Sequence, residues 1–197
     1  MDDRGVSGTD PQATAGTVVE FEHGDALLVV DVLADFSHED GASLLASFRE
    51  RGATMAAAIE AARDGGIPVI YVNDDRDRWD GDAPALARET AGGPGGDVIR
   101  PLLPRPGDSV LLKHRYSAFD HTALELLLEA RSVERVLIVG ASTEGCVVQT
   151  ALDAREHGLK ATIVADACAT TDAGLEELAL RYADEVGGIR VQSNGMM

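Results

Sequence analysis

Short apolar runs alternate with segments of helical periodicity from residue 26 onward, and this alternation constrains the fold more than any other feature of the sequence. Most of the runs are continuously apolar, which is typical of parallel strands buried on both faces. The runs cover residues 26–32, 67–72, 109–112, 135–139 and 161–165, with a weaker one at 189–191. The pattern predicts an α/β fold of three αβα layers, with a doubly wound, mostly parallel six-stranded sheet in the order 3-2-1-4-5-6.

Apolar residues between the first four runs recur at the spacing of amphipathic helices. One such segment covers 44–62 and closes at a pair of glycines, and a second covers 120–130. In the second segment Thr122 and Glu125 are three residues apart, as in a capping box. Both segments are predicted to be crossover helices.

Two further helices are predicted in the C-terminal half of the chain. The first begins with Thr143 as its N-cap and stops before Gly158, which suits a helix C-terminus. The second is expected to have Asp172 as its N-cap. Its inward-facing stripe is expected to consist of Leu175, Leu178, Ala179 and Tyr182.

Two segments depart from the strand–helix alternation. Residues 1–24 are polar and aperiodic, so we expect a flexible tail there and one folded domain over 25–197. The connection 73–108 is rich in Asp, Arg, Gly and Pro, and connections of this length in compact domains are usually functional or disordered. We expect it to form a wall or lid of the active site, with a short helix over 83–89.

Composition and charge exclude several classes of function. The 197-residue chain carries a formal charge of −17, which repels phosphate backbones and anionic lipid, so neither nucleic acid nor a membrane is an expected partner. No apolar stretch approaches the ~20 residues that span a bilayer, and the N-terminus lacks a signal-peptide pattern, so a cytoplasmic location is expected. The two cysteines, Cys146 and Cys168, do not make a disulfide framework and are predicted to be thiols.

Three ionisable side chains stand where apolar runs end. Asp31 and Lys113 each close a predicted strand, and Cys146 follows the strand-ending Gly140 at the start of a helical segment. Ligands of open α/β sheets bind beyond the carboxyl ends of the strands, where the strand order reverses. The predicted strand order brings these three ends together, so we expect them to form one site. The helix N-terminus is also expected to bias Cys146 towards thiolate.

The proton transfers that thiol attack on an amide requires suggest a role for each of these side chains. A thiol with an ordinary pKa of ~8.5 is mostly protonated at pH 7, so its attack on an amide carbonyl requires a base and a nearby cation. Asp31 can take the proton and later return it to the leaving nitrogen, while Lys113 supplies the positive charge. The backbone N–H groups of Ser142 and Cys146 are candidates for an oxyanion hole.

The residues around these positions resemble the isochorismatase-like cysteine hydrolases, which include nicotinamidases, N-carbamoylsarcosine amidase and biuret hydrolase. The matching segments are 28–32, 69–74, 112–119, 140–154 and 164–168, and their order and spacing make the combination specific. The resemblance covers about residues 26–173. It implies a triad of Asp31, Lys113 and Cys146, and a cis peptide bond between Ala141 and Ser142.

The segment after the second strand departs from the pattern of one branch of that family. Nicotinamidases carry an Asp-x-His and a further histidine there, which form a metal site, whereas this chain has no histidine between His38 and His114. Asp74, Asp75 and Asp77 could hold a hard cation, but a solvated acidic loop is the favoured interpretation. We therefore expect neither a metal nor another cofactor.

Aromatic residues make up only 4% of the chain, and four of them fall around the predicted site. As pocket walls they would suit a small, flat or partly apolar amide. For the two phenylalanines, packing in the core is an equal alternative. The predicted substrate-binding residues are Phe36, Asn73, Trp79, Tyr116 and Phe119.

Several other polar residues near these segments have simpler interpretations. Cys168 is predicted to be a buried small hydrophobe, and His114 is expected to point away from the lysine that precedes it if the strand continues. Arg76, Arg78 and Arg115 could clamp a substrate carboxylate, although ordinary solvent exposure is the favoured interpretation.

The sequence thus predicts a metal-independent cysteine hydrolase that cleaves a C–N bond in a small amide, urea or carbamoyl compound through a thioester on Cys146. One alternative is a cofactor-free, isochorismatase-type vinyl-ether hydrolase that uses Asp31. The other is a non-catalytic, flavodoxin-like binding module in which the cysteine only packs. The acidic surface and the resemblance favour a homo-oligomer, a dimer or a tetramer.

Overall fold

The computed structural model describes residues 19–193 and contains a six-stranded sheet in the order β3-β2-β1-β4-β5-β6. All neighbouring strands are parallel, which confirms the predicted fold class and strand order. The strands are β1 (Asp25–Val30), β2 (Val69–Asp74), β3 (Ser109–Lys113), β4 (Arg135–Ala141), β5 (Lys160–Ala169) and β6 (Arg190–Gln192).

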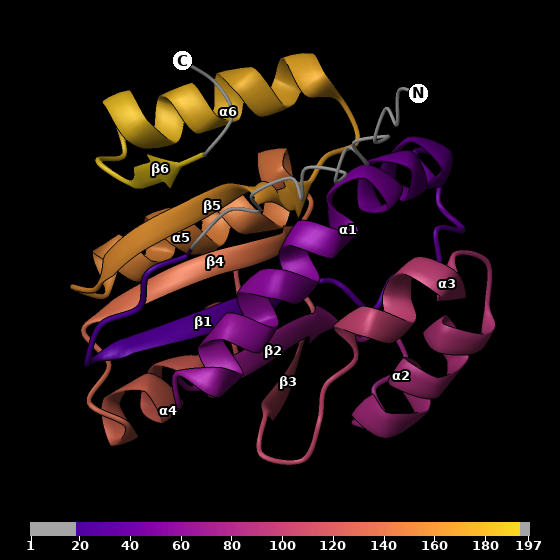
Figure 1. Ribbon diagram of the computed structural model, residues 1–197, viewed down its shortest axis with the longest axis horizontal. Coiled ribbons are helices and arrows are strands. Elements are labelled where there is room, and N and C mark those ends of the chain that lie inside the picture. Colours follow the sequence, from indigo (N-terminus) through magenta and orange to yellow (C-terminus); the bar gives the residue numbers. More distant parts are fainter. Residues whose placement is uncertain (1–18, 194–197) are drawn as a thin grey trace, which may run out of the picture.

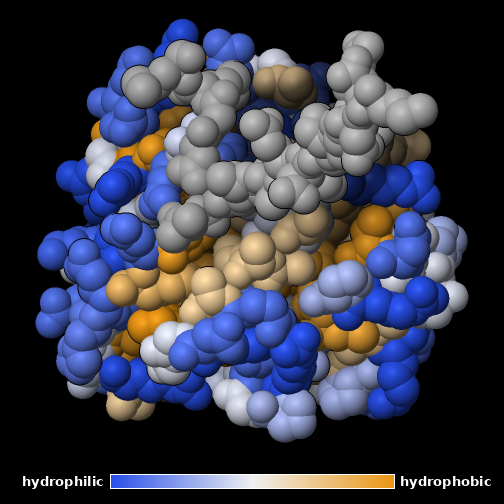
Figure 2. All heavy atoms as spheres, in the orientation of Figure 1, coloured by the Kyte–Doolittle hydropathy of each residue, from blue (hydrophilic) through white to orange (hydrophobic). Residues whose placement is uncertain are grey.

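Helices cover both faces of this sheet, and Figure 1 shows α1 crossing the near face while α4 and α5 lie behind it. The near layer contains α1 (Gly41–Asp64), α2 (Ala83–Gly92), α3 (Gly96–Ile99) and the 3₁₀ turn η1 (Arg100–Leu102). The far layer contains α4 (Leu124–Ala130), the π-helical turn η2 (Thr143–Val147), α5 (Val148–Glu156) and α6 (Ala173–Glu185). In the orientation of Figure 2, hydrophilic residues dominate the edges of the near face, and apolar ones gather towards its middle.

The central strand β1 shows why its sequence is apolar without a break. Leu27 and Val29 belong to the core under α1, whereas Leu28 and Val30 belong to the core under α4 and α5. Successive side chains of a strand point to opposite faces, so both faces of β1 need apolar residues. The chain buries β1 completely, and only its carboxyl end is available for polar chemistry.

Of the four residues expected on the inward stripe of α6, Ala179 packs against the core and the other three do not face inward. Leu175, Leu178 and Tyr182 are each more than half exposed, and the buried side chains of the helix are those of Glu176 and Ala183. The rotation of the helix follows from polar contacts at its first turn, where the buried Glu176 pairs with Arg51 on α1. Asp172 caps α6 as predicted, because its Oδ1 accepts a hydrogen bond from the backbone N–H of Leu175 at 2.8 Å.

Two other predicted caps also differ. Ser142 occupies the N-cap position before η2, and Thr143 lies inside the turn. Glu125 forms no capping box with Thr122, because its carboxylate pairs with His157 at 2.9 Å and α4 begins only at residue 124. In both places the side chain that the local pattern assigns to the cap, Thr143 or Glu125, instead contacts a residue distant in the sequence.

The long connection after β2 is mostly a packed wall. It contains the predicted short helix, observed as α2, and also the unpredicted α3 and η1. Leu86, Ile99 and Leu102 from these elements are buried in the core with α1. Only the first residues of the connection, Asn73, Asp74 and Arg76, reach a cavity beside the predicted site.

Packing begins before residue 25, which shortens the predicted tail. Val19 is buried and Phe21 packs against the same core as α1, while the rest of the predicted tail, residues 1–18, lies outside the described residues. Cys168 is buried on β5, as predicted. None of the helices among residues 19–193 has the length and apolar character required to cross a membrane.

Candidate active site

Asp31 lies directly after β1, where the backbone leaves the strand. Its φ of 50° is left-handed, a conformation that aspartate tolerates better than most residues. The backbone N–H of Asp31 still donates to Val72 of β2 at 3.1 Å, and its Oδ1 accepts from the N–H of Asp74 at 2.6 Å. Both ends of the residue are therefore fixed to the neighbouring strand.

Lys113 is the last residue of β3, and only 1% of its side chain is exposed. Its Nζ lies 2.7 Å from Oδ2 of Asp31, 3.4 Å from Sγ of Cys146 and 2.9 Å from the carbonyl oxygen of Arg115. Burial opposes the charge of the ammonium, but the neighbouring Asp31 and Cys146 outweigh this and raise the pKa of Lys113. The amine is therefore a fixed cation between a carboxylate and a thiol.

Cys146 lies in the η2 turn between β4 and α5. Burial, and next the charge of Asp31, raise the pKa of this thiol to about 12, although Lys113 works in the opposite direction. The expected bias towards thiolate is therefore wrong for the unliganded site, because desolvation and a nearby carboxylate exceed the effect of a helix start. The thiol is protonated at neutral pH and needs a base.

Asp31 has the properties of such a base. Its burial raises the carboxyl pKa above the ordinary 3.8, while Lys113 and hydrogen bonds from Cys146 and the Asp74 backbone counteract part of that rise. A carboxyl group with a raised pKa accepts a proton more readily than an ordinary one. The three predicted catalytic side chains thus meet in one hydrogen-bonded group.

The turn that carries Cys146 begins with two unusual backbone features. Gly140 has a φ of +127°, and a Cβ there would lie 1.9 Å from the carbonyl oxygen of Val30, so only glycine allows this approach of β4 to the end of β1. The following Ala141–Ser142 peptide bond is cis, at the position that the resemblance implies. The carbonyl oxygen of Ser142 accepts the N–H groups of Gly145 and Val147, which closes the turn. The oxyanion role of the Ser142 and Cys146 N–H groups stays a prediction.

Buried polar contacts hold this turn against two other elements, and one of these is in turn bound to α1. The hydroxyl of Thr143 is 3.0 Å from both the carbonyl oxygen of Ala169 on β5 and Oε1 of Glu176 on α6. Glu176 in turn pairs with Arg51 on α1, whose Nη2 donates at 2.8 Å. Sequence reasoning missed this network, because a Thr and a Glu on separate helices give no local signal of their contact.

Two cavities meet at Asp31. The smaller, of about 230 Å³, is lined among others by Asn73, Arg76 and Ser142. The larger, of about 410 Å³, contains Cys146 and is lined also by Lys113, His114, Arg115 and Tyr116. Asp31 and Asp74 line both cavities. The volumes suit small molecules.

Only two of the five predicted substrate-binding residues line these cavities. Tyr116 lines the larger one and is 73% exposed. Asn73 lines the smaller one and is 3% exposed, and its Oδ1 accepts the N–H of Leu33 at 2.8 Å while its Nδ2 donates to the carbonyl of the same residue. Asn73 therefore fixes the backbone after β1 to the end of β2.

The other three predicted pocket residues lie elsewhere. Phe36 packs edge-to-face on Phe48 of α1, and Phe119 is buried and stacks on His157. Burial in the core outweighed a position in the pocket for both rings. Trp79 is 71% exposed and lines neither cavity.

His114 was expected to point away from Lys113 if the strand continued beyond residue 113, and this condition is not met. The strand ends at residue 113, so the alternation of side chains stops there. The Nδ1 atom of His114 lies 2.9 Å from Oδ1 of Asp75, and the imidazole stacks on Trp79 with ring centroids 3.6 Å apart. These contacts hold His114 in the wall of the Cys146 cavity.

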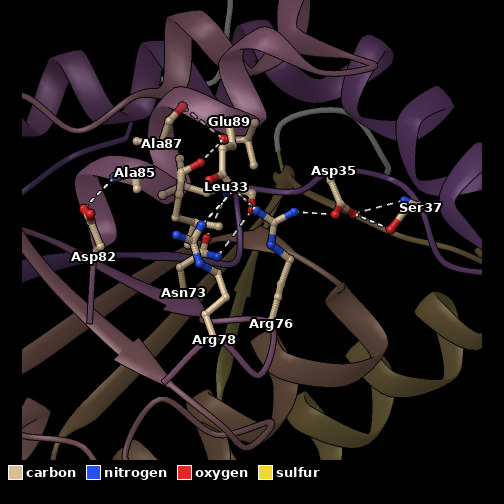
Figure 3. A network of polar contacts seen from close by, with 12 residues as sticks. Leu33, Asp35, Ser37, Asn73, Arg76, Arg78, Asp82, Ala85, Ala87 and Glu89 are labelled. Carbon is tan, nitrogen blue, oxygen red and sulfur yellow. Dashed lines mark hydrogen bonds and ion pairs between the residues drawn. The ribbon is translucent and has the colours of Figure 1, made fainter. Parts of the chain in front are cut away.

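The acidic segment after β2 is a hydrogen-bonded turn. The carboxylate of Asp75 accepts the backbone N–H groups of Asp77 and Trp79, both at 3.0 Å. Figure 3 shows Arg76 and Arg78 reaching from this turn towards Asp35 and Glu89. Within residues 19–193 no group of three or more His, Cys, Asp or Glu side chains is arranged to hold a metal ion.

Comparison with known proteins places the chain among similar sequences and structures. Residues 25–194 match the Isochorismatase domain. The uncharacterized isochorismatase family protein YaaI of Bacillus subtilis is 31% identical over 82% of this chain and 89% of its own length. The maleamate amidohydrolase of Pseudomonas putida is 30% identical over 89% of this chain and 88% of its own length. The structure of N-carbamoylsarcosine amidase from Thermoplasma acidophilum is 30% identical, with a TM-score of 0.62 over 88% of this chain and 98% of that one. The protein with the Asp31–Lys113–Cys146 group is thus a member of the isochorismatase family of hydrolases.

Proposed function

We propose that this protein is a metal-independent cysteine amidohydrolase that cleaves a C–N bond of a small amide, urea or carbamoyl compound through a thioester on Cys146. The observation that carries the proposal is the position of Lys113 Nζ, 2.7 Å from Asp31 Oδ2 and 3.4 Å from Cys146 Sγ. A base, a cation and a nucleophile are thereby in mutual contact at the wall of a cavity. Relatives that act on maleamate and on N-carbamoylsarcosine support a C–N bond as the target.

The first half-reaction forms the thioester. Asp31 accepts the proton of the Cys146 thiol as Sγ attacks the substrate carbonyl carbon, and Lys113 stabilises the negative charge that passes through the sulfur. The tetrahedral intermediate then collapses, the C–N bond breaks, and Asp31 returns the proton to the nitrogen. Ammonia or an amine leaves, and the acyl group remains on Sγ.

The second half-reaction consumes one water molecule. Asp31, again a carboxylate, takes a proton from the water as its oxygen attacks the thioester carbon. Collapse of the second tetrahedral intermediate breaks the C–S bond and releases the acid, and the proton on Asp31 returns to Sγ. The sum is amide plus water giving acid plus ammonia or amine, with the enzyme unchanged.

Each tetrahedral intermediate carries an oxyanion that needs hydrogen-bond donors. The N–H groups of Ser142 and Cys146 belong to the turn that also carries the nucleophile, so they are the donors that we assign. One such donor contributes roughly 2.7 to 4 kcal/mol to transition-state stabilisation in other hydrolases. The contacts of Thr143 with β5 and α6 support their preorganisation.

Vinyl-ether hydrolysis through Asp31 alone is the principal alternative. That chemistry needs a proton donor but no thiol, whereas Cys146 Sγ contacts the buried amine of Lys113. The contact favours the covalent route.

The test is ammonia release from a panel of small amides, ureas and carbamoyl compounds. Wild-type protein should release ammonia from at least one class, and acid-quenched intact-mass analysis should show an acyl adduct on Cys146. Cys146→Ala should lose turnover and adduct together. Cys168→Ala is the matched control, because this second thiol is buried on β5 outside both cavities, and it should keep most of the activity. Near-wild-type turnover by Cys146→Ala would refute the thioester.

A further inference from the structure

We infer that Arg115 is the carboxylate-binding residue of the Cys146 cavity, so that the preferred substrates are small amide acids or ureido acids rather than neutral amides. The inference rests on the proposed function and narrows its substrate class. It is based on which positively charged side chains around the two cavities have an acidic partner.

Most cationic side chains near the site already have acidic partners. Lys113 pairs with Asp31, and the guanidinium of Arg76 pairs with Asp35 and lies 3.7 Å from Glu89. Arg78 pairs with Asp80 at 3.1 Å and with Glu89 at 2.7 Å, as Figure 3 shows in part. These guanidinium groups are neutralised by the protein itself.

Arg115 differs from these residues. It lines the larger cavity together with Cys146, and its guanidinium has no ion-pair partner among the residues that the structure describes. A chain with a formal charge of −17 offers many carboxylates, so an arginine beside the nucleophile without one is available for an anionic ligand. Its planar fork of donors matches a carboxylate bidentately.

The backbone of Arg115 is held firmly at the site. Its carbonyl oxygen accepts a hydrogen bond from Lys113 Nζ at 2.9 Å. The preceding His114 is fixed by Asp75 at 2.9 Å and by stacking on Trp79. The guanidinium therefore starts from a rigid anchor two residues from the catalytic lysine, which lowers the entropy cost of binding.

The depth of the cavity sets the orientation of the substrate. Lys113 is buried at the inner end with the thiol, whereas Arg115 and Tyr116 are exposed residues of the same cavity. A substrate with its reactive carbonyl at Cys146 can thus direct a carboxylate to the outer wall, where the charge remains partly hydrated. Maleamate and N-carbamoylsarcosine, the substrates named for two relatives, each combine a cleavable C–N bond with a carboxylate.

The test uses matched pairs of acids and neutral amides, maleamate with maleamide and N-carbamoylsarcosine with its amide. In at least one pair the wild type should favour the acid by about tenfold or more in kcat/KM. Arg115→Gln should lower kcat/KM for that acid by about 10- to 100-fold, mainly through KM, because a charge-assisted contact is lost. The kcat/KM of the same variant for the neutral amide of that pair should equal the wild-type value.

Two further variants distinguish the effects of the charge and geometry of Arg115 from a general loss of stability or activity. Arg115→Lys keeps the positive charge but not the planar guanidinium, so its loss of kcat/KM for the acid should be intermediate. Arg78→Gln is the matched control, because Arg78 lines neither cavity and pairs with Asp80 and Glu89. Its preference for the acid should equal that of the wild type. Equal losses on acid and neutral substrate in Arg115→Gln would overturn the inference.

Calorimetry on Cys146→Ser makes the subsite measurable without turnover. The acid should bind at least tenfold tighter than the neutral amide, and adding Arg115→Gln should abolish that difference. If no compound is hydrolysed but this binding pattern holds, the proposed function fails and the subsite stands. If the amides are hydrolysed but the acid binds no better than the neutral amide, or not at all at millimolar concentration, the subsite fails and the proposed function stands.

Discussion

Asp31 and Lys113 form a buried ion pair across a strand that separates them. Nζ of Lys113 lies 2.7 Å from Oδ2 of Asp31, although β1 and β3 both pair with β2 and not with each other. The contact is available only beyond the carboxyl end of β2, where Asp74 supplies the N–H that holds Oδ1 of Asp31. The ends of three consecutive strands in the sheet thus converge on one carboxylate.

Removing one partner of this ion pair should cost more stability than removing both. Lys113→Met leaves Asp31 buried without its cation, which in other proteins costs about 3–5 kcal/mol. The double variant Asp31→Asn with Lys113→Met leaves no charge to desolvate, so its free energy of unfolding should return to the wild-type value or exceed it. Urea unfolding of the wild type, both single variants and the double variant measures this coupling. Additive losses in the double variant would contradict it.

The alkylation of Cys146 should depend strongly on pH. Because the pKa of this thiol is raised to about 12, the iodoacetamide rate should rise about tenfold per pH unit from pH 7 to 10 without a plateau. Asp31→Asn removes a negative charge that disfavours thiolate, so its alkylation should be faster than wild type at each pH, while amide turnover collapses for lack of a base.

Asp35→Asn is the control for this experiment, since Asp35 also lines the smaller cavity but pairs with Arg76. Its alkylation curve should overlay that of the wild type. A wild-type plateau below pH 9 would mean that the thiolate is stable at rest and needs no proton acceptor.

Exhaustive chelation should leave activity unchanged. The carboxylate of Asp75 is occupied by the N–H groups of Asp77 and Trp79 and by His114, which leaves it poorly suited to a cation. The measurement is turnover after dialysis against a strong chelator, together with metal analysis of the protein. A nicotinamidase with the Asp-x-His metal site serves as the sensitive control. Loss of activity that one equivalent of a divalent ion restores would show the prediction to be wrong.

Thr143→Val should lower kcat without a comparable change in KM. The substitution keeps the shape of the side chain but removes the contacts with Ala169 and Glu176 that hold the turn carrying Cys146. We expect about a tenfold loss in kcat and about 1–2 kcal/mol in stability. Thr122→Val is the matched control, because it removes a 2.6 Å hydrogen bond to Ala118 away from both cavities. A kcat loss of equal size in both variants would assign the effect to general destabilisation.

The sequence predicted that Asp31, Lys113 and Cys146 lie together, because their positions follow from local patterns. Uninterrupted apolar runs predicted buried parallel strands, and polar residues at their ends had to meet at one edge. Gly140 marked the break after β4, and the structure shows that any larger residue there would collide with Val30. These features needed no knowledge of tertiary contacts.

The remaining differences arise from contacts between distant segments. The rotation of α6 depends on Glu176 meeting Arg51, 125 positions away. The state of the Cys146 thiol depends on burial and on Asp31, which helix position alone does not reveal. Phe36 packs on Phe48 of α1, and Phe119 is buried in the core under α4 and α5. Neither contact can be predicted from local sequence. Such outcomes are decided by packing and desolvation.

The interior position of β1 determines when during folding the enzyme can become active. β1 must pair with β2 on one side and with β4 on the other, and the latter partner is more than a hundred residues further along the chain. Helices form in microseconds from neighbouring residues, whereas pairings between distant strands pay a large loop-closure entropy and form late. Until β4 pairs with β1, the turn that carries Cys146 has no fixed position beside Asp31 and Lys113. After dilution from denaturant we therefore expect turnover to return more slowly than the helical circular-dichroism signal.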